Sequence, residues 1–200
     1  MKKRLLTITI STILILTLQP GAAAVTHTVQ KGESLWKIAV KYKMGISEIF
    51  AANSQIPNFD LIYPNQKIEV PLPDQNLQAI VNEVVRLTNQ KRTANGLKPL
   101  TENWELSRIA QYKSNEMRDK NYFSHQSPAY GTPFEMLKKF GIKYSAAGEN
   151  IAKGQKTAAE VVDSWWNSPG HKQNMLNPNF TQIGIGNATP GNYWTQIFTG

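Results

Sequence analysis

A pair of prolines, Pro71 and Pro73, divides this chain of 200 residues into two segments that we expect to fold separately. Proline lacks the amide hydrogen and fixes its own backbone, so neither a helix nor an inner strand runs through the pair. The segment before it, 26–71, has the length of a small module, and the longer segment after it can bury one substantial core. We therefore expect a linker over 72–79 and a second domain over 80–200.

The first residues have the pattern of a secretory signal peptide. Met1–Arg4 carries three positive charges, Leu5–Leu18 forms an apolar run of 14 residues, and Ala22–Ala24 supplies small residues for cleavage. A helix that spans a bilayer needs about 20 apolar residues, so this run is short for an anchor, and a retained anchor is the alternative to cleavage. We expect residues 1–24 to be removed on export, which leaves no stable membrane anchor.

The composition excludes several classes of function. The chain has no cysteine, so thiol catalysis and disulfide scaffolds are excluded, and stability must come from burial. Its formal net charge of +8 includes three charges in the leader, and the rest of the chain has no basic stripe of the kind that binds nucleic acid. The remaining weak excess suits an anionic polymer of the envelope, or it serves only for solubility.

Residues 26–71 are expected to form a strand, two helices and a second strand. Residues 26–30 alternate towards a strand, and Ser34 after them is a natural N-cap for a helix. Ser47 is expected to start the second helix, and residues 67–70 alternate as the closing strand. The apolar face of the first helix has the spacing i, i+3, i+4, i+7 and consists of Leu35, Ile38, Ala39 and Tyr42.

Two stretches of this segment closely resemble the LysM family: Thr28–Ala39 matches its opening motif, and Asn53 with Asp60–Ile68 matches its closing half. The resemblance implies a small βααβ module that binds polymers containing N-acetylglucosamine, either peptidoglycan or a chitin-like glycan. It implies a shallow groove formed by Gly32, Glu33, Ser34 and Leu35 on one side and by Asp60, Leu61 and Ile62 on the other. The free amides of a helix N-terminus can bond an N-acetyl carbonyl, although Gly32 and Ser34 can also serve only as a turn and a cap.

The second domain has its helices first and its strands last, which favours an α+β sandwich. Two capping boxes, at Thr132 and Thr157, each precede a helix. The expected helices are 77–93, 106–117, Thr132 to Gly141 and Thr157 to Pro169, and the expected strands are 183–186 and 193–198.

Two histidines and one glutamate stand out in this domain. His125 and His171 lie beside small turn residues, and Glu149 lies between a glycine and an apolar run, where it is expected to be partly buried. A buried carboxylate needs a partner, and a histidine can supply one. We expect the three side chains to converge, either as a ligand site or as a network that only ties three loops together.

The same domain closely resembles the CAP superfamily, also called SCP or PR-1-like. The motifs that carry the resemblance are Leu87–Arg92, Leu97–Leu100, Phe123–His125, Gly148–Ile151, Trp165–His171 with Asn174–Leu176, and Gly184–Gly186. The resemblance covers the chain from about Ile80 to its end and implies an α-β-α sandwich.

Many members of this superfamily line a cleft with two histidines and two glutamates. Three of those places would be filled here, by His125, Glu149 and His171. The second glutamate is usually found shortly after the tryptophan, where this chain has Asn167 and Ser168. Glu160 and Asp163 come too early to replace it.

Three functions stay open for this cleft. We favour a binding or structural role, because the second carboxylate of the cleft and a nucleophile motif are missing. The alternative is a hydrolase of the cell wall, with Glu149 as general base beside the two histidines, or with a divalent metal such as Zn²⁺ held by His125 and His171. A lipid carrier would need a long apolar groove that the sequence does not indicate. In each case we expect a secreted monomer associated with the cell wall, and the vegetative wall, the medium and the spore envelope stay open.

Overall fold

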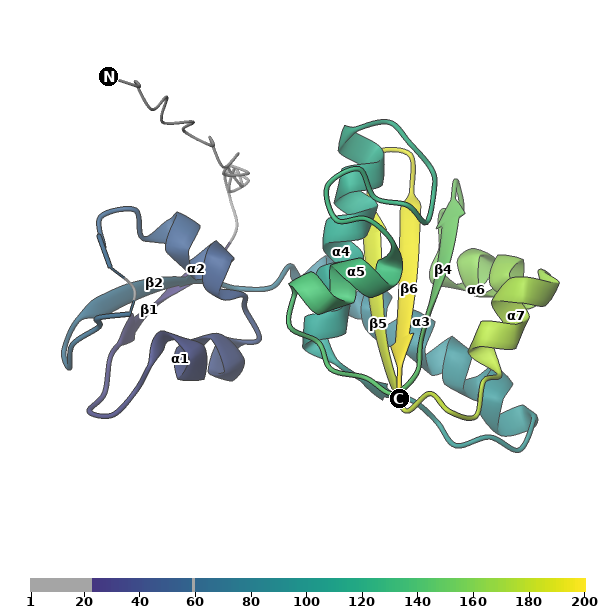
Figure 1. Ribbon diagram of the computed structural model, residues 1–200, viewed down its shortest axis with the longest axis horizontal. Helices are drawn as coiled ribbons and strands as arrows, with labels where there is room; N and C mark the ends of the chain where they lie inside the picture. The colour runs from purple at the N-terminus through teal and green to yellow at the C-terminus, as the bar shows by residue number, and fades with distance from the viewer. Residues whose placement is uncertain (1–22, 59) are drawn as a thin grey trace, which may run out of the picture. The chain divides into compact units, whose positions relative to one another are not determined.

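The computed structural model describes residues 23–58 and 60–200 of the chain (Figure 1). The expected signal peptide falls almost wholly on residues 1–22, which lie outside the described part, and it stays a prediction. The described residues divide into two compact units, with the boundary between Leu72 and Pro73. Among the helices of the described ranges, none has the length and apolar character that crossing a bilayer requires.

The first unit has the expected order of strand, helix, helix and strand. Strand β1 (Ala24–Thr28) pairs antiparallel with β2 (Lys67–Pro71), and α1 (Leu35–Tyr42) and α2 (Ile46–Ala52) come between them in the chain. Its buried core consists of Val29, Leu35, Ile38, Ala39, Ile49, Ile56, Ile68 and Val70. The spacing of apolar residues therefore identified the face of α1 that is buried.

The starts of the two helices are set by different kinds of cap. Ser34 caps α1 as expected, since its hydroxyl accepts a hydrogen bond from the amide of Lys37. The prediction that Ser47 starts α2 is wrong, because the helix begins one residue earlier, after Gly45. Gly45 has extended backbone and no side chain, so α2 lacks the side-chain hydrogen bond that caps α1.

A buried asparagine joins the end of α2 to strand β2. The amide nitrogen of Asn53 donates to the carbonyls of Ile49 at 2.7 Å and Glu69 at 2.6 Å, and its amide oxygen accepts from the Glu69 amide at 2.9 Å. Asn53 is fully buried, so these bonds satisfy groups that water cannot reach. The match of Asn53 to the LysM motif thus corresponds to a structural role.

Four strands form the sheet of the second unit, in the order β3-β5-β6-β4. They are β3 (Thr101–Glu102), β4 (Ala147–Lys153), β5 (Gln182–Ala188) and β6 (Tyr193–Thr199), and only β3 runs parallel to its neighbour. The sequence predicted β5 and β6. It did not predict β3, which is very short, or β4, which carries the polar residues Glu149 and Asn150 at its centre.

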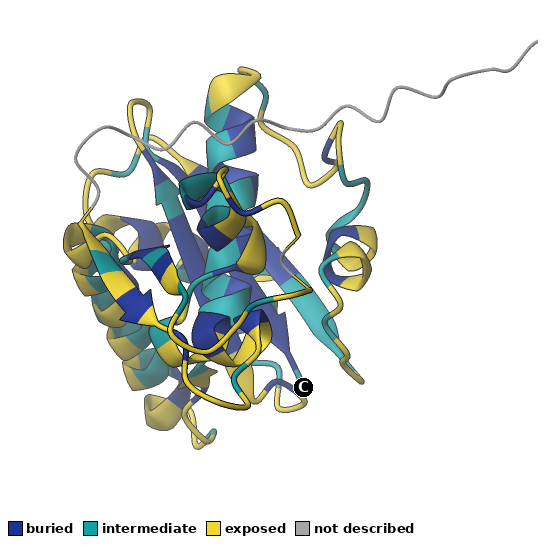
Figure 2. Ribbon diagram, turned by 90° about the vertical axis from the view of Figure 1, so that its left-hand side faces the viewer, coloured by how far each residue is buried: buried dark blue, intermediate teal, exposed yellow. Residues whose placement is uncertain are grey.

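Helices cover both faces of this sheet (Figure 1). One face packs against α3 (Gln75–Ala94), α6 (Ala158–Trp166) and α7 (Pro169–Met175), and the other against α4 (Trp104–Asp119) and α5 (Pro133–Lys139). Strands β5 and β6 are buried along most of their length (Figure 2). The predicted α-β-α sandwich of an α+β domain is confirmed.

Helix α3 begins within the stretch expected as a linker, 72–79. The carboxylate of Asp74 accepts hydrogen bonds from the amides of Asn76 at 2.8 Å and Leu77 at 3.4 Å. This N-cap allows the helix to start at Gln75, so only the residues around Pro73 stay outside regular structure.

One of the two predicted capping boxes is complete and the other is half formed. At α5 the hydroxyl of Thr132 accepts from the amide of Glu135, whose carboxylate accepts from the amide of Thr132. At α6 the hydroxyl of Thr157 accepts from the amide of Glu160, but the carboxylate of Glu160 binds the amide of Lys156 at 2.7 Å. Both helices nevertheless start where the sequence predicts.

Glycines let α4 pack directly on strand β5. A Cβ atom at Gly184 would lie 2.2 Å from the backbone of Leu106, and one at Gly186 would lie 2.3 Å from the backbone of Ala110. No side chain larger than hydrogen fits at either position without moving the helix. Because side chains alternate along β5, Gly184 and Gly186 face α4, whereas Ile183 and Ile185 face α3 on the other side of the sheet.

Candidate functional site

The turn between β1 and α1 carries the first side of the expected glycan groove. Gly32 and Ser34 are exposed, Gly32 has a backbone φ of 82°, and the space beside it is open. Leu35 is only 5% exposed and belongs to the core of the module. Of the four expected residues on this side, Gly32 and Ser34 thus have the exposure that contact with a glycan requires.

Glu33 is turned towards its own module. Its carboxylate accepts a hydrogen bond from the amide of Gln30 at 2.8 Å and lies 2.8 Å from Nε2 of the buried His27. These bonds, with the one from Gln30 the larger, lower the pKa of Glu33. On its other side, Nδ1 of His27 lies 3.1 Å from the hydroxyl of Tyr42. These hydrogen bonds join Glu33 to Tyr42 through the buried His27 and fix the shape of the turn. The sequence did not reveal them.

The second expected side of the groove lies on the loop between α2 and β2. Asp60 and Leu61 are exposed, and Ile62 is half-buried against the core. A hollow of about 460 Å³ runs along this loop. It is lined by Gln55, Ile56, Pro57, Asn58, Leu61, Tyr63, Gln66 and Lys67. Of the three expected residues, Leu61 lines this hollow.

In the second unit, His125 and Glu149 meet beside the edge strand β4. Glu149 lies on the face of the sheet that α4 covers, as does its cross-strand partner Ile197. His125 comes from the segment that follows α4, and its Nδ1 lies 2.6 Å from Oε1 of Glu149. The Glu149 side chain is 3% exposed and that of His125 is 52% exposed. A buried carboxylate thus orients an imidazole that faces solvent.

The next residue of β4 reaches the second histidine from the opposite face of the sheet. Asn150 donates from its amide nitrogen to the carbonyl of His171 at 3.1 Å and to Oε1 of Gln196 at 2.9 Å. The amide oxygen of Asn150 accepts from Asn174 at 2.8 Å, and Asn174 also donates to the carbonyl of Glu149 at 3.2 Å. Neighbouring residues of one strand therefore hold both histidine-bearing segments. Sequence reasoning missed Asn150 and Asn174, although both lie within the motifs that it singled out.

The structure does not supply the second acidic group of the site from α6. Asn167 ends this helix as its C-cap, the Glu160 carboxylate binds the amide of Lys156, and Asp163 forms an ion pair with Lys91 at 3.2 Å. Within residues 23–58 and 60–200, no cluster of three or more His, Asp or Glu side chains is placed to hold a metal ion. His125 and His171, which the sequence offered as zinc ligands, thus belong to no such cluster.

We expect His171 to titrate below the ordinary histidine value of 6.5. Burial lowers the pKa of this imidazole, and the nearby His125 lowers it further. His171 binds a proton less readily in the folded protein than in the unfolded chain. The free energy of unfolding is therefore at its full value above pH 6.5 and decreases as the pH falls from 6.5 towards the folded pKa of His171. An NMR titration of the ring protons measures the midpoint, and His125→Asn should raise it. An unchanged midpoint in that variant would contradict the proximity of the two rings.

Known proteins resemble both units. The family model of the LysM domain matches residues 27–71, and that of CAP, the cysteine-rich secretory protein family, matches residues 85–199. The YkwD protein of Bacillus subtilis (strain 168) is 58% identical over 125 residues, which are 62% of this chain and 49% of that protein. SpoIVD-associated factor A of the same organism is 56% identical over 45 residues, which are 22% of this chain and 12% of that protein.

A solved structure supports the fold of the second unit. It is an extracellular protein containing a SCP domain from Bacillus anthracis str. Ames, with a TM-score of 0.58 and 30% identity, covering 68% of this chain and 47% of that one. The present chain thus spans about half the length of this protein and of YkwD. The family model covers more than half of the present chain. The chain belongs to the CAP, or cysteine-rich secretory protein, family and carries a LysM domain ahead of its CAP domain.

Proposed function

We propose that this protein is exported as a monomer and retained in the cell wall by its LysM domain. LysM is a peptidoglycan-binding domain, and the single observation that carries the proposal is the open β1–α1 turn. Gly32 and Ser34 are exposed there, while Glu33 is bonded inward and fixes the backbone around them. A fixed turn with accessible amides can bond an N-acetyl group with little loss of conformational entropy. A spore envelope is the alternative location, since SpoIVD-associated factor A shares this segment.

At the wall, the CAP domain presents His125, Glu149 and His171 as a binding site. Its support is the combination of a half-exposed imidazole, a buried carboxylate that orients it, and a second histidine close enough to influence its neighbour's charge. Such a site can accept or donate hydrogen bonds to a polar ligand. We favour binding over catalysis because the acidic residues of α6 are engaged elsewhere.

A hydrolase is the second candidate, and one observation favours it. The 2.6 Å contact between Glu149 and His125 is the geometry of a general base, His125, beside the carboxylate that orients it, Glu149. Release of new glycan or peptide ends from purified wall, lost in Glu149→Gln, would favour this candidate over a binding protein.

The wall-binding proposal predicts that a charge introduced in the expected groove weakens binding to peptidoglycan, whereas the same charge elsewhere on the surface of the module does not. Leu61→Glu places a charge in the expected groove, at a side chain that is 56% exposed, and should weaken sedimentation with purified peptidoglycan about tenfold. Val40→Glu is the matched control, because Val40 is 43% exposed on α1 and lies outside the expected groove. Deletion of residues 26–71 should abolish sedimentation. The proposal is wrong if the deleted protein still pellets as well as the whole chain.

A further inference from the structure

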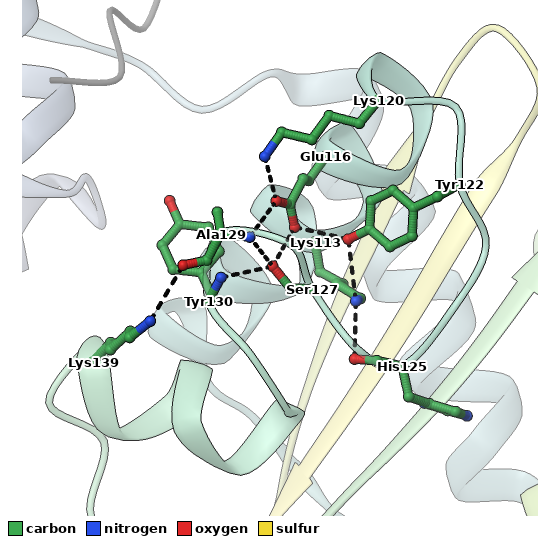
Figure 3. A network of polar contacts seen from close by, with 9 residues as sticks. All are labelled: Lys113, Glu116, Lys120, Tyr122, His125, Ser127, Ala129, Tyr130 and Lys139. Atoms are coloured by element: carbon green, nitrogen blue, oxygen red, sulfur yellow. Dashed lines mark hydrogen bonds and ion pairs between the residues drawn. The ribbon is translucent and has the colours of Figure 1, made fainter. Parts of the chain in front are cut away.

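A lysine lies buried beneath the loop that carries His125. Lys113, on α4, is only 1% exposed, and its Nζ donates to the carbonyl of His125 at 3.0 Å and to the hydroxyl of Tyr122 at 3.2 Å (Figure 3). Burial lowers the pKa of Lys113, while the carboxylates of Glu149 and Glu116 oppose that shift. A buried ammonium group is costly unless neighbouring groups stabilise its charge, so this lysine needs an explanation beyond packing.

A glutamate one turn further along α4 holds the rest of the loop. The Glu116 carboxylate accepts hydrogen bonds from the hydroxyls of Tyr122 at 2.7 Å and Ser127 at 2.5 Å, from the Ala129 amide at 3.2 Å and from Lys120 at 2.8 Å (Figure 3). Burial opposes its ionisation, but the bonds from Lys120, Ser127 and Tyr122 outweigh burial and lower the pKa of Glu116. The carboxylate therefore stays charged and fully bonded inside the domain.

The two α4 residues contact the loop on both sides of His125. Tyr122 comes before the histidine and its hydroxyl joins Lys113 to Glu116, whereas the contacts at Ser127 and Ala129 come after it. We infer that Lys113 and Glu116 are positioning residues for His125, which hold its imidazole against Glu149 and present it to a ligand. This inference rests on the proposed binding function of the site.

The same network favours one tautomer of His125. An ionised carboxylate only accepts hydrogen bonds, so Nδ1 of His125 carries the hydrogen that points at Glu149. Nε2 is then left with its lone pair for a ligand. Glu149 and Lys113 attract each other, which offsets part of the effect of burial on the pKa of Lys113. The tautomer of the ring is thus set by Glu149 on β4, and its position by the loop that Lys113 and Glu116 hold.

Stability alone does not account for a charge at position 113. Replacing a buried ionic network by apolar side chains of similar size is often neutral or stabilising. Methionine has nearly the length of lysine and would fill the same space without a charge. The variant Lys113→Met removes only this charge and leaves the carboxylates of Glu149 and Glu116 in place, so its stability has to be measured beside its effect on the loop.

The test uses the mature full-length chain and two measurements of the free protein. In Lys113→Met, nitrogen NMR of the His125 ring should change from a single Nδ1–H tautomer to a mixture. Hydrogen exchange at the Ala129 amide should become about tenfold faster, because the loop loses the bond at the His125 carbonyl. The matched control is Lys138→Met, at an exposed lysine of α5, which should change neither measurement.

Tyr122→Phe provides a second variant that keeps both charges. It removes only the hydroxyl between Lys113 and Glu116, and we expect a smaller change in the same two measurements. If Lys113→Met does not fold, this variant decides the question. A single tautomer with unchanged exchange in the folded variants would overturn the inference. Adding soluble peptidoglycan fragments to the wild type tests the binding function separately, because a lack of shifts at His125 and His171 contradicts that function and not the positioning role.

Discussion

Replacing Arg92 by methionine should destabilise the CAP domain by about 3 to 5 kcal/mol. Arg92 is 1% exposed, and burial lowers the pKa of its guanidinium. Its nitrogens donate to four main-chain carbonyls, at Lys98 (3.0 Å), Met175 (2.8 Å), Asn177 (3.0 Å) and Phe180 (3.4 Å). One side chain of α3 therefore fixes two separate stretches of chain, and its loss would leave several buried carbonyls without a donor.

Chemical denaturation followed by far-ultraviolet circular dichroism measures this loss. Arg86→Met is the matched control on the same helix, because Arg86 is exposed and forms an ion pair with the half-exposed Glu83. An exposed ion pair contributes little, so the control should unfold at the wild-type denaturant concentration. A loss below about 1 kcal/mol in Arg92→Met would contradict the structural role assigned to the carbonyl contacts.

Gly186→Ala should cost about 3 kcal/mol, the upper end of the range for overpacked cores. The added methyl group would lie 2.3 Å from the backbone of Ala110, and backbone atoms in the middle of a helix cannot move aside alone. The whole of α4 would have to shift, together with Lys113 and Glu116 that it carries.

Gly170→Ala is the matched control for that substitution. Gly170 lies in α7 and a Cβ there would meet nothing within 4 Å, so alanine should be neutral or slightly stabilising. The comparison is made by denaturant unfolding of both variants. Equal stability of Gly186→Ala and Gly170→Ala would show that α4 can move away from β5 at little cost.

Local patterns were enough to predict most of the helices and the apolar strands. The spacing of Leu35, Ile38 and Ala39 gave the buried face of α1, and the capping box at Thr132 gave the start of α5. Both signals depend on residues close in sequence, and the resulting structure satisfies them locally. Strand β4 escaped prediction because its central residues are polar, and their partners come from distant parts of the chain.

The sequence pointed to the residue types of the candidate site. It did not point to the residues that hold the loop of His125 in place. A carboxylate beside an apolar run needs a partner, and this argument pointed to a histidine; in the structure His125 makes that contact with Glu149. Lys113 lies on the buried face of the helix that the sequence predicts over 106–117, and the sequence assigns it no role. A lysine on such a face three residues before a glutamate was the available signal, but its meaning depends on a loop whose path the sequence does not specify.

Strand β4 places Glu149 and Asn150 on opposite faces of one sheet, and each holds a different histidine-bearing segment. Side chains alternate along a strand, so moving its pairing by one position would exchange the two faces and part each residue from its histidine. Loss or gain of one residue within 147–153 would do this, whereas point replacements would not. This site can therefore evolve by replacement of side chains, whereas an insertion or deletion within β4 would separate Glu149 and Asn150 from the segments that they hold.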